Sequence, residues 1–262
     1  MDLQLTDRKA FISGSTKGIG LAIATSLARE GARVVINSRS AESIASALEH
    51  IRGAVPNAVV DGFTGDLARA EESDRLFRQL SSVDILVNNL GIYEPKPFED
   101  ISDGDWRRFF EVNVLSGIRL SRAYLPGMKK RNWGRIIFIS SESGINIPVE
   151  MIHYGMTKTA MLAVSRGIAE TCAGTGVTSN AILPGPTHTA GVDEFVAELS
   201  GGIPFAEFEK EFFRKVRPTS LLRRFALPEE VAGLVTFVCS PLSSATNGAA
   251  LRVDGGVVRT CF

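Results

Sequence analysis

The sequence has few of the residues that build disulfide frameworks or metal sites. Its 262 residues include only three cysteines and three histidines. Cys172, Cys239 and Cys261 form no Cys-x-x-Cys pair and no metal-binding spacing, and an odd number of cysteines fits poorly with a secreted disulfide scaffold. We therefore expect a reducing, cytoplasmic environment and no bound metal.

The sequence also lacks an excess of either charge and any long apolar run. Lys and Arg together number 29, as do Asp and Glu. This balance gives no long-range attraction to nucleic acid or to an anionic membrane. No apolar run approaches the roughly 18 residues of a membrane span, and the first residues, MDLQLTDRKA, have no signal-peptide core. We expect a soluble protein with a small-molecule partner, and neither nucleic acid nor membrane.

Short β-rich runs alternate with longer helical patterns along the chain, which is typical of βαβ units in a parallel sheet. The predicted strands are KAFIS, RVVIN, AVVDGF, DILVNN, GRIIFIS, VTSNAIL and GAALRVDGG. No linker or repeat interrupts this alternation, and the length suits one large α/β domain. We predict that residues 1–262 form a single-domain, doubly wound Rossmann fold of about seven parallel strands with helices on both faces.

Residues 189–217 interrupt this alternation. The segment combines charged residues and a Gly-Gly-Ile-Pro turn, a composition that predicts two short amphipathic helices. Because it follows the carboxyl end of a strand, we predict a helical insertion that covers an apolar substrate site. A contact with another subunit is the alternative. Its phenylalanines are Phe195, Phe205, Phe208, Phe212 and Phe213.

A glycine-rich loop follows the first predicted strand and opens the first predicted helix. Its glycines have the spacing Gly-x-x-x-Gly-x-Gly. Glycines permit a tight turn and a close approach of the backbone to a pyrophosphate, which a helix N-terminus attracts. We predict a dinucleotide site there, formed by Gly14, Ser15, Thr16, Lys17, Gly18, Ile19 and Gly20.

Polar and glycine residues also follow later strands. In an open parallel sheet, ligands bind outside the carboxyl ends of the strands, although turns of this composition also end strands where no ligand binds. The candidate cofactor-binding residues at these strand ends are Asp66 and Leu67, Asn89 and Gly91, and Pro184, Gly185, Thr187 and Thr189.

Tyr154 and Lys158 lie four residues apart where a helical pattern begins. In a helix both side chains emerge on one face. An ammonium beside a phenol lowers the pKa of the phenol from about 10, which allows the tyrosine to exchange protons. Ser141 stands thirteen residues before Tyr154, directly after an apolar run. An exposed helical pair without a chemical role is the alternative.

Three further polar residues have less specific surroundings. Asn113 lies within the apolar pattern FFEVNVLSGI, where its amide needs a hydrogen-bond partner. A helix kink or cap that satisfies the amide locally is the alternative. His153 and His188 have no carboxylate at a fixed spacing, so we expect them to line a pocket at most.

Together these residues resemble the short-chain dehydrogenase/reductase superfamily over essentially the whole chain. The family usually has alanine at the position of Leu90; a leucine there would either shift the adenine-side wall of the cofactor site or simply pack. The residues that carry the resemblance are Gly14, Gly18 and Gly20, Asp66, Asn88-Asn89-x-Gly91, Asn113, Ser141, Tyr154-x-x-x-Lys158, Pro184-Gly185 and Val253-Asp254-Gly255-Gly256.

The resemblance implies a role for each catalytic candidate. Tyr154 would be the general acid in reduction and the base in oxidation, and Lys158 would lower its pKa and bind the nicotinamide ribose. Ser141 would hold the substrate oxygen, and Asn113 would anchor a water that relays protons to Lys158. The residues agree independently, since a pair of hydroxyls suits a carbonyl oxygen that gains charge and then a proton. The resemblance also implies a homo-oligomer, either a dimer or a tetramer.

The end of the second strand, RVVINSRS, indicates which cofactor binds. An acidic residue there binds the adenosine ribose and repels a 2′-phosphate, whereas a nearby arginine accommodates that phosphate. Ser38 stands where the acid would be expected, Arg39 follows it, and Lys17 lies in the glycine loop. We predict NADP(H) as the cofactor; ordinary surface charges at Arg39 and Lys17 are the alternative.

The predicted function is an oxidoreductase that transfers a hydride between NADP(H) and a carbonyl or alcohol substrate, with Tyr154 as general acid/base. A 3-oxoacyl thioester reductase, acting on an acyl carrier protein, is the alternative. A catalytically silent nucleotide-binding protein is a rival of another class, and the presence of all four catalytic candidates argues against it. The basic residues that would support carrier docking are Arg122, Lys129, Lys130 and Arg131.

Overall fold

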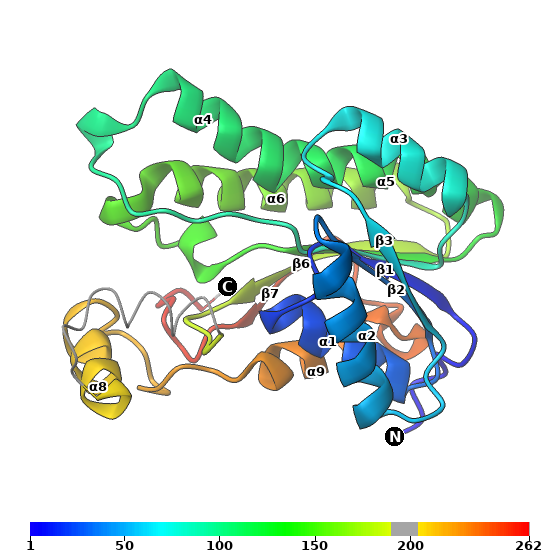
Figure 1. Cartoon of the computed structure of the whole chain (residues 1–262). Helices are drawn as coiled ribbons and strands as arrows, with labels where there is room; N and C mark the ends of the chain where they lie inside the picture. The colour runs from blue at the N-terminus through cyan, green and yellow to red at the C-terminus, as the bar shows by residue number, and fades with distance from the viewer. Residues whose placement is uncertain (190–203, 262) are drawn as a thin grey trace.

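The computed structural model describes residues 1–189 and 204–261. Within these residues seven parallel strands form one sheet in the order β3-β2-β1-β4-β5-β6-β7 (Figure 1). This sheet confirms the prediction of a doubly wound α/β fold. The strands are β1 (Lys9–Ile12), β2 (Arg33–Ser38), β3 (Val60–Thr64), β4 (Ile85–Asn88), β5 (Gly134–Ile139), β6 (Val177–Pro184) and β7 (Ala250–Val253).

Helices cover both faces of the sheet, as predicted. Figure 1 shows one layer that contains α3 (Ala70–Gln79), α4 (Asp103–Phe110), α5 (Ser116–Lys130) and α6 (Ile152–Thr171). The opposite layer contains α1 (Gly18–Arg29), α2 (Ala41–Ala54) and α9 (Pro228–Cys239). No helix in the described part of the chain is long and apolar enough to cross a bilayer.

Two apolar clusters join these layers to the sheet. Ile12 and Ile36 belong to the cluster beneath α1 and α9, whereas Phe11 and Phe138 belong to the cluster beneath α5 and α6. Because both faces are covered, the central strands read as continuous apolar runs, and every residue of β5 and β6 is buried. Helices thus cover both faces of the sheet, and a ligand can approach only the ends of its strands.

The order of strands reverses between β1 and β4. β1 pairs with β2 on one side and with β4 on the other, both in parallel. A crevice for a ligand opens at such a switch point, outside the carboxyl ends of the strands. The glycine loop follows β1 and the segment Asn88–Gly91 ends β4, so the fold brings these two predicted motifs to one crevice.

Only part of the predicted insertion at residues 189–217 lies within the described residues. One of its two predicted helices is present as α8 (Phe205–Lys215), which stands apart from the other helices in Figure 1. The rings of Phe205, Phe212 and Phe213 all contact Phe225, at centroid distances of 5.0–5.8 Å. Phe195 lies outside the described residues, so its predicted place over the substrate stays a prediction.

Candidate active site

The glycine loop turns tightly because Gly14 and Gly18 adopt left-handed backbone angles, with φ of 59° and 56°. A Cβ on Gly20 would lie 2.6 Å from both Asn89 Nδ2 and the Gly14 carbonyl oxygen. Lys17 caps α1 without a side-chain hydrogen bond. The N–H groups of the first turn therefore remain available as donors, and they carry the positive end of the helix dipole. These features fit the pyrophosphate of a dinucleotide.

Asn37, which was not among the predicted site residues, holds the glycine loop to two strand ends. Its Oδ1 accepts a hydrogen bond from the Gly14 N–H at 3.1 Å. Its Nδ2 donates to the carbonyl oxygens of Phe63 and Gly65 at 3.1 and 3.0 Å. The buried Ser15 hydroxyl accepts a hydrogen bond from the Asn37 N–H at 2.9 Å. Ser15 therefore shapes the loop from inside. The signal for Asn37 was a polar residue at the end of an apolar strand.

Asn89 fastens the end of β4 to the same loop. Its Nδ2 donates to the carbonyl oxygens of Ser13 and Gly14 at 3.0 and 2.8 Å. Leu90, where the family resemblance led us to expect alanine, packs against the apolar cluster beneath α5 and α6. Its Cδ1 would lie 3.4 Å from a Cβ on Gly14. Of the two expectations for Leu90, packing against the loop is the one that the contacts support.

The carboxyl end of β2 carries a hydroxyl and a cation in place of an acid. Ser38 is half-buried, and its hydroxyl accepts a hydrogen bond from the Ser40 N–H at 3.3 Å. Arg39 and Lys17 are exposed. Within residues 1–189 and 204–261 neither cation pairs with a carboxylate. Both are therefore available to a phosphate group.

Asp66, Leu67 and Pro184 lie at the ends of β3 and β6, as predicted. The Asp66 carboxylate accepts a hydrogen bond from the Ala68 N–H at 3.2 Å and so stabilises the turn after β3. Leu67 is buried in the core, and its side chain faces away from solvent. A cofactor would therefore meet Leu67 through its backbone.

The segment after β6 returns to the glycine loop. A Cβ on Gly185 would lie 2.5 Å from the Asp254 carbonyl oxygen, so this turn requires glycine. The buried Thr187 hydroxyl donates to the Gly185 carbonyl at 2.9 Å. Thr189 lies with its Cγ2 3.2 Å from the position of a Cβ on Gly18. The predicted cofactor residues of the glycine loop and of the segment after β6 thus line one crevice.

α6 presents Tyr154 and Lys158 together at the carboxyl edge of the sheet. Lys158 Nζ lies 5.5 Å from the centroid of the Tyr154 ring and donates to the Ile139 carbonyl at 2.9 Å. Ser141 follows β5 and lines the same pocket as Tyr154, and its hydroxyl accepts a hydrogen bond from the Ser143 N–H at 3.1 Å. The four-residue spacing of Tyr154 and Lys158 thus places both side chains on one face of α6, as we expected.

The pKa of Tyr154 shifts in the direction opposite to our expectation. Burial raises the pKa of Tyr154 to about 12, against the opposing effect of the hydrogen bond with Ser141. Burial also lowers the pKa of Lys158 to about 8. Both shifts have burial as their largest cause, because a low-dielectric site disfavours the charged form of either group. The expected lowering of the tyrosine pKa by Lys158 is therefore wrong for the protein alone, and Tyr154 is a protonated donor at neutral pH.

Asn113 lies in a π-helical turn, η2 (Glu111–Leu115), which joins α4 to α5. Such turns occur frequently at functional sites. Its Oδ1 accepts from the Ile92 N–H at 2.8 Å, and its Nδ2 donates to the Ile92 carbonyl at 3.0 Å and the Thr157 hydroxyl at 2.9 Å. The side chain thus fixes the segment after β4 against α6. The implied water relay to Lys158 stays a prediction.

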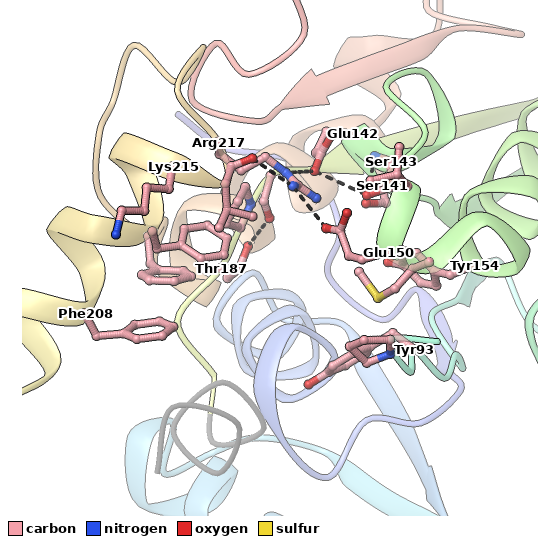
Figure 2. Close-up of a pocket in the computed structure, with 18 of the residues that line it drawn as sticks. Tyr93, Ser141, Glu142, Ser143, Glu150, Tyr154, Thr187, Phe208, Lys215 and Arg217 are labelled. Carbon is pink, nitrogen blue, oxygen red and sulfur yellow. Dashed lines mark hydrogen bonds and ion pairs between the residues drawn. The ribbon is translucent and has the colours of Figure 1, made fainter. Parts of the chain in front are cut away.

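A pocket of roughly 870 Å³ opens beside Ser141 and Tyr154. Figure 2 shows these two residues on one side of the pocket and Phe208 and Lys215, from α8, on the other. Phe212 also lines it from α8. The wall opposite the catalytic hydroxyls is therefore partly aromatic, which agrees with a partly apolar substrate.

Residues that the sequence did not predict also line this pocket. The Tyr93 ring meets Tyr154 edge to face at 6.4 Å between centroids. Arg217 Nε donates to Glu142 Oε1 at 2.8 Å, and Arg217 Nη1 reaches Glu150 Oε1 at 3.4 Å (Figure 2). Burial raises the pKa of Glu142, while Arg217 opposes that shift. A glutamate next to Ser141 was a usable signal, but nothing in the sequence pointed to Arg217.

The two histidines agree with our expectation that they line a pocket at most. His153 is fully buried between α4 and α6, with its ring centroid 3.9 Å from that of Phe109. Burial lowers the pKa of His153, so the ring is neutral and serves as packing. His188 stacks on Phe205 at 4.4 Å and borders a second, smaller pocket beside α1. Neither histidine lines the pocket beside Tyr154.

Residues 14–258 match the family model described as enoyl-(acyl carrier protein) reductase. With the parallel sheet, the glycine loop and the Ser141, Tyr154 and Lys158 cluster, this match shows the class of protein. The chain belongs to the short-chain dehydrogenase/reductase family of oxidoreductases.

Particular relatives agree with this assignment over their full lengths. YvaG, an uncharacterized oxidoreductase of Bacillus subtilis, is 48% identical, with 100% of each chain covered. The 3-oxoacyl-[acyl-carrier-protein] reductase FabG of Aquifex aeolicus is 32% identical over 98% of this chain and 100% of its own. The crystal structure of L-sorbose reductase from Gluconobacter frateurii, complexed with NADPH and L-sorbose, has a TM-score of 0.93 at 29% identity and covers 99% of this chain and 100% of its own.

Proposed function

We propose that this protein is an NADP(H)-dependent reductase that converts a carbonyl group to an alcohol and can catalyse the reverse oxidation. One observation carries the proposal: a hydroxyl pair, Ser141 and Tyr154, stands between a glycine loop suited to a dinucleotide and a pocket of roughly 870 Å³. This arrangement suits a reaction in which a nucleotide cofactor and a small molecule meet at one oxygen atom.

Each catalytic side chain has a distinct task in this proposal. The bound nicotinamide cofactor supplies the hydride to the carbonyl carbon. Ser141 and Tyr154 hold the carbonyl oxygen, and Tyr154 gives it a proton as negative charge develops. Tyr154 can do so because its pKa of about 12 keeps the phenol protonated at neutral pH. Lys158 holds the ribose of the nicotinamide, as in the family, and Asn113 fixes the segment that borders it.

The cofactor is NADP(H) in this proposal. The support is local: no acid stands at Ser38, while Arg39 and Lys17 are unpaired within the described residues. A guanidinium can bind a 2′-phosphate through two parallel hydrogen bonds. The complex of the sorbose reductase with NADPH gives the same direction.

Specificity constants for NADPH and NADH test this choice. Because a hydrogen bond to a charged group contributes about 1.5–3 kcal/mol, Arg39→Ala should lower kcat/KM for NADPH about 10- to 100-fold. Ser38→Asp should reverse the preference toward NADH. Arg33→Ala, at the exposed opposite end of the same strand, is the matched control and should change neither constant. A clear preference of the wild-type protein for NADH would exclude the assignment.

The 3-oxoacyl thioester alternative needs a basic docking surface, and the contacts of the candidate residues do not favour one. Arg131 donates to the Val83 carbonyl at 2.8 Å, and Lys129 donates to the Thr171 carbonyl. These contacts hold the end of α5 at the amino edge of the sheet, opposite the pocket. FabG of Aquifex aeolicus remains a specific reason to include such thioesters in a substrate screen.

The proposal includes a homo-oligomer in the cytoplasm, as the family resemblance implies. The candidate contact residues Leu162, Val164 and Ile168 on α6 are partly buried against the chain's own core, so only part of each is free for a partner. Two-fold pairing of identical helices is the commonest arrangement in soluble oligomers. Light scattering at micromolar concentration should report a dimer or tetramer, and a monomer would contradict the proposal.

A further inference from the structure

Glu142 and Arg217 form a buried ion pair in the wall of the pocket. Their side chains are 3% and 10% exposed, and the Nε to Oε1 distance is 2.8 Å. Glu142 directly follows Ser141, whereas Arg217 lies just beyond α8 (Figure 2). A buried ion pair contributes little to stability, because the loss of hydration offsets the attraction of the charges. Its place in a substrate pocket therefore points to recognition.

Part of the hydrogen-bonding capacity of this pair is unused. Glu142 Oε2 is buried and has no partner among the described residues. Arg217 donates from Nε to Glu142 and from Nη1 to Glu150, but no described residue accepts from Nη2. Buried polar atoms are rarely left without a partner. Glu142 Oε2 is therefore an acceptor, and Arg217 Nη2 a donor, that no described residue uses.

The pair shares one pocket with the hydroxyls that would hold a carbonyl oxygen. Glu142 directly follows Ser141, and both residues line the pocket together with Tyr154 and Arg217. A ligand in this pocket therefore lies beside both the hydroxyls and the ion pair.

The charges that line the pocket disfavour an anionic ligand. Among the described residues, the lining includes the carboxylates Glu142, Glu150 and Glu211 and the cations Lys215 and Arg217. Arg217 is already paired with Glu142 and Glu150, and Lys215 with Glu211. A ligand carboxylate would gain little from Arg217 and Lys215, because glutamates already neutralise both charges, and those glutamates would repel it. A neutral hydroxyl, in contrast, donates one hydrogen bond and accepts another.

We propose that Glu142 and Arg217 form a subsite for a hydroxyl group of a neutral, hydroxylated carbonyl substrate. The hydroxyl donates to Glu142 Oε2 and accepts from Arg217 Nη2, while the carbonyl oxygen rests on Ser141 and Tyr154. Because Glu142 is adjacent to Ser141 in the chain, this hydroxyl stands close to the reacting carbonyl. The inference rests on the proposed reductase function and adds a substrate class to it.

Three ketones of matched shape test this subsite in the wild-type protein. In α-hydroxyacetophenone and propiophenone, the carbon next to the aryl ketone carries a hydroxyl or a methyl group, and in phenylglyoxylate that carbon is itself a carboxylate. The ring of each suits the aromatic wall of the pocket. We expect kcat/KM with NADPH to be at least about tenfold higher for the hydroxyketone than for propiophenone, and lowest for phenylglyoxylate, because a site built for a hydroxyl rejects an analogue that lacks one.

Glu142→Gln tests whether Glu142 binds the substrate hydroxyl. The amide keeps the volume of the side chain but replaces one hydrogen-bond acceptor with a donor. The ratio of kcat/KM for hydroxyketone over propiophenone should fall about tenfold. Arg217→Lys, which keeps the charge but not the second N–H fork, should lower the ratio less. Glu71→Gln removes an exposed carboxylate on α3 and is the matched control, which should leave the ratio unchanged. Thermal melts of each variant report whether it folds.

The outcomes separate this inference from the proposed function. A wild-type protein that reduces propiophenone as well as the hydroxyketone, or prefers phenylglyoxylate, overturns the inference and leaves the reductase intact. The same holds if it reduces other ketones but none of these three, or if Glu142→Gln leaves the ratio unchanged. Failure to reduce any ketone in a wide panel, despite NADPH binding measured by fluorescence, overturns the reductase function, and the inference falls with it.

Discussion

The cofactor crevice and the substrate pocket are built in different ways. Short side chains such as Asn37 and Asn89 hold the crevice by hydrogen bonds to backbone atoms of the glycine loop. Long charged and aromatic side chains line the pocket, and the pair Glu142 and Arg217 joins residues 75 positions apart. Close packing restricts the sequence of the crevice, as at Gly20, where a Cβ would lie 2.6 Å from the Gly14 carbonyl oxygen. The pocket instead takes its properties from the side chains that line it.

The largest expected effect separates catalysis from cofactor binding. Tyr154→Phe removes the hydroxyl that we propose as the proton donor and keeps the ring, so kcat should fall about 10²–10⁴-fold. The dissociation constant of NADPH should stay within a few fold, because the glycine loop is untouched. Steady-state kinetics and fluorescence titration measure the two quantities. Turnover at the wild-type level would refute the role of Tyr154.

A second substitution should damage the crevice and leave the pocket intact. In Gly20→Ala, the new Cβ would lie 2.6 Å from both the Gly14 carbonyl oxygen and Asn89 Nδ2. We expect this clash to weaken NADPH binding by at least about tenfold and to lower the melting temperature. Gly53→Ala, in α2, is the matched control because a Cβ there meets nothing within 4 Å. It should stabilise the protein by about 0.4–1 kcal/mol. If Gly20→Ala and Gly53→Ala had equal effects on NADPH binding, the glycine loop would not be the binding site that we propose.

Burial of the charged Lys158 side chain should lower the free energy of unfolding at neutral pH. Its pKa falls from 10.5 to about 8 in the folded protein, so below pH 8 folding must bury a charge that the unfolded chain exposes to water. Lys158→Met should therefore abolish turnover and raise the free energy of unfolding by about 1–3 kcal/mol at neutral pH. This increase in the free energy of unfolding should shrink as the pH rises from about 8 to 10.5, because over that range the lysine is deprotonated in the folded protein but still protonated in the unfolded chain. Urea unfolding at several pH values measures it, and a less stable variant would contradict the account.

The smallest expected effect concerns the aromatic wall of the pocket. Phe208→Ala should raise KM for aryl ketones several-fold and leave KM for small ketones and for NADPH unchanged, because the ring contributes apolar contact area to the substrate alone. Phe77→Ala, a partly exposed phenylalanine on α3, serves as the control. An altered oligomeric state with unchanged substrate preference would favour the subunit-contact alternative for α8.

The features that the sequence predicted correctly depend on local order. Strand and helix periodicity predicted the sheet, and the four-residue spacing of Tyr154 and Lys158 placed both on one helix face. Ser141 could be assigned because it ends an apolar run, and the carboxyl ends of parallel strands share one edge. Such features need only the distance between residues along the chain.

The features that it did not predict depend on packing between distant segments. The pKa of Tyr154 rises because tertiary structure buries the phenol, and the local lysine does not offset this. His153 lies between two helices because of how α4 crosses α6, which no local pattern encodes. The partner of Glu142 is an arginine from the far side of an insertion, so the sequence alone left the charged part of the pocket unknown.

The π-helical turn at Glu111–Leu115 has a consequence for how the chain tolerates changes in length. A π turn holds one residue more than an α-helical turn, so it corresponds to a single-residue insertion in the helix that runs from α4 into α5. Deleting Val112 would remove that extra residue and allow α-helical hydrogen bonding across the junction of α4 and α5, while Pro126 would still lack a donor within α5. Asn113 would then turn away from Ile92 and Thr157. A codon deletion, which ordinarily disrupts a helix, would here yield a more regular helix and an inactive enzyme.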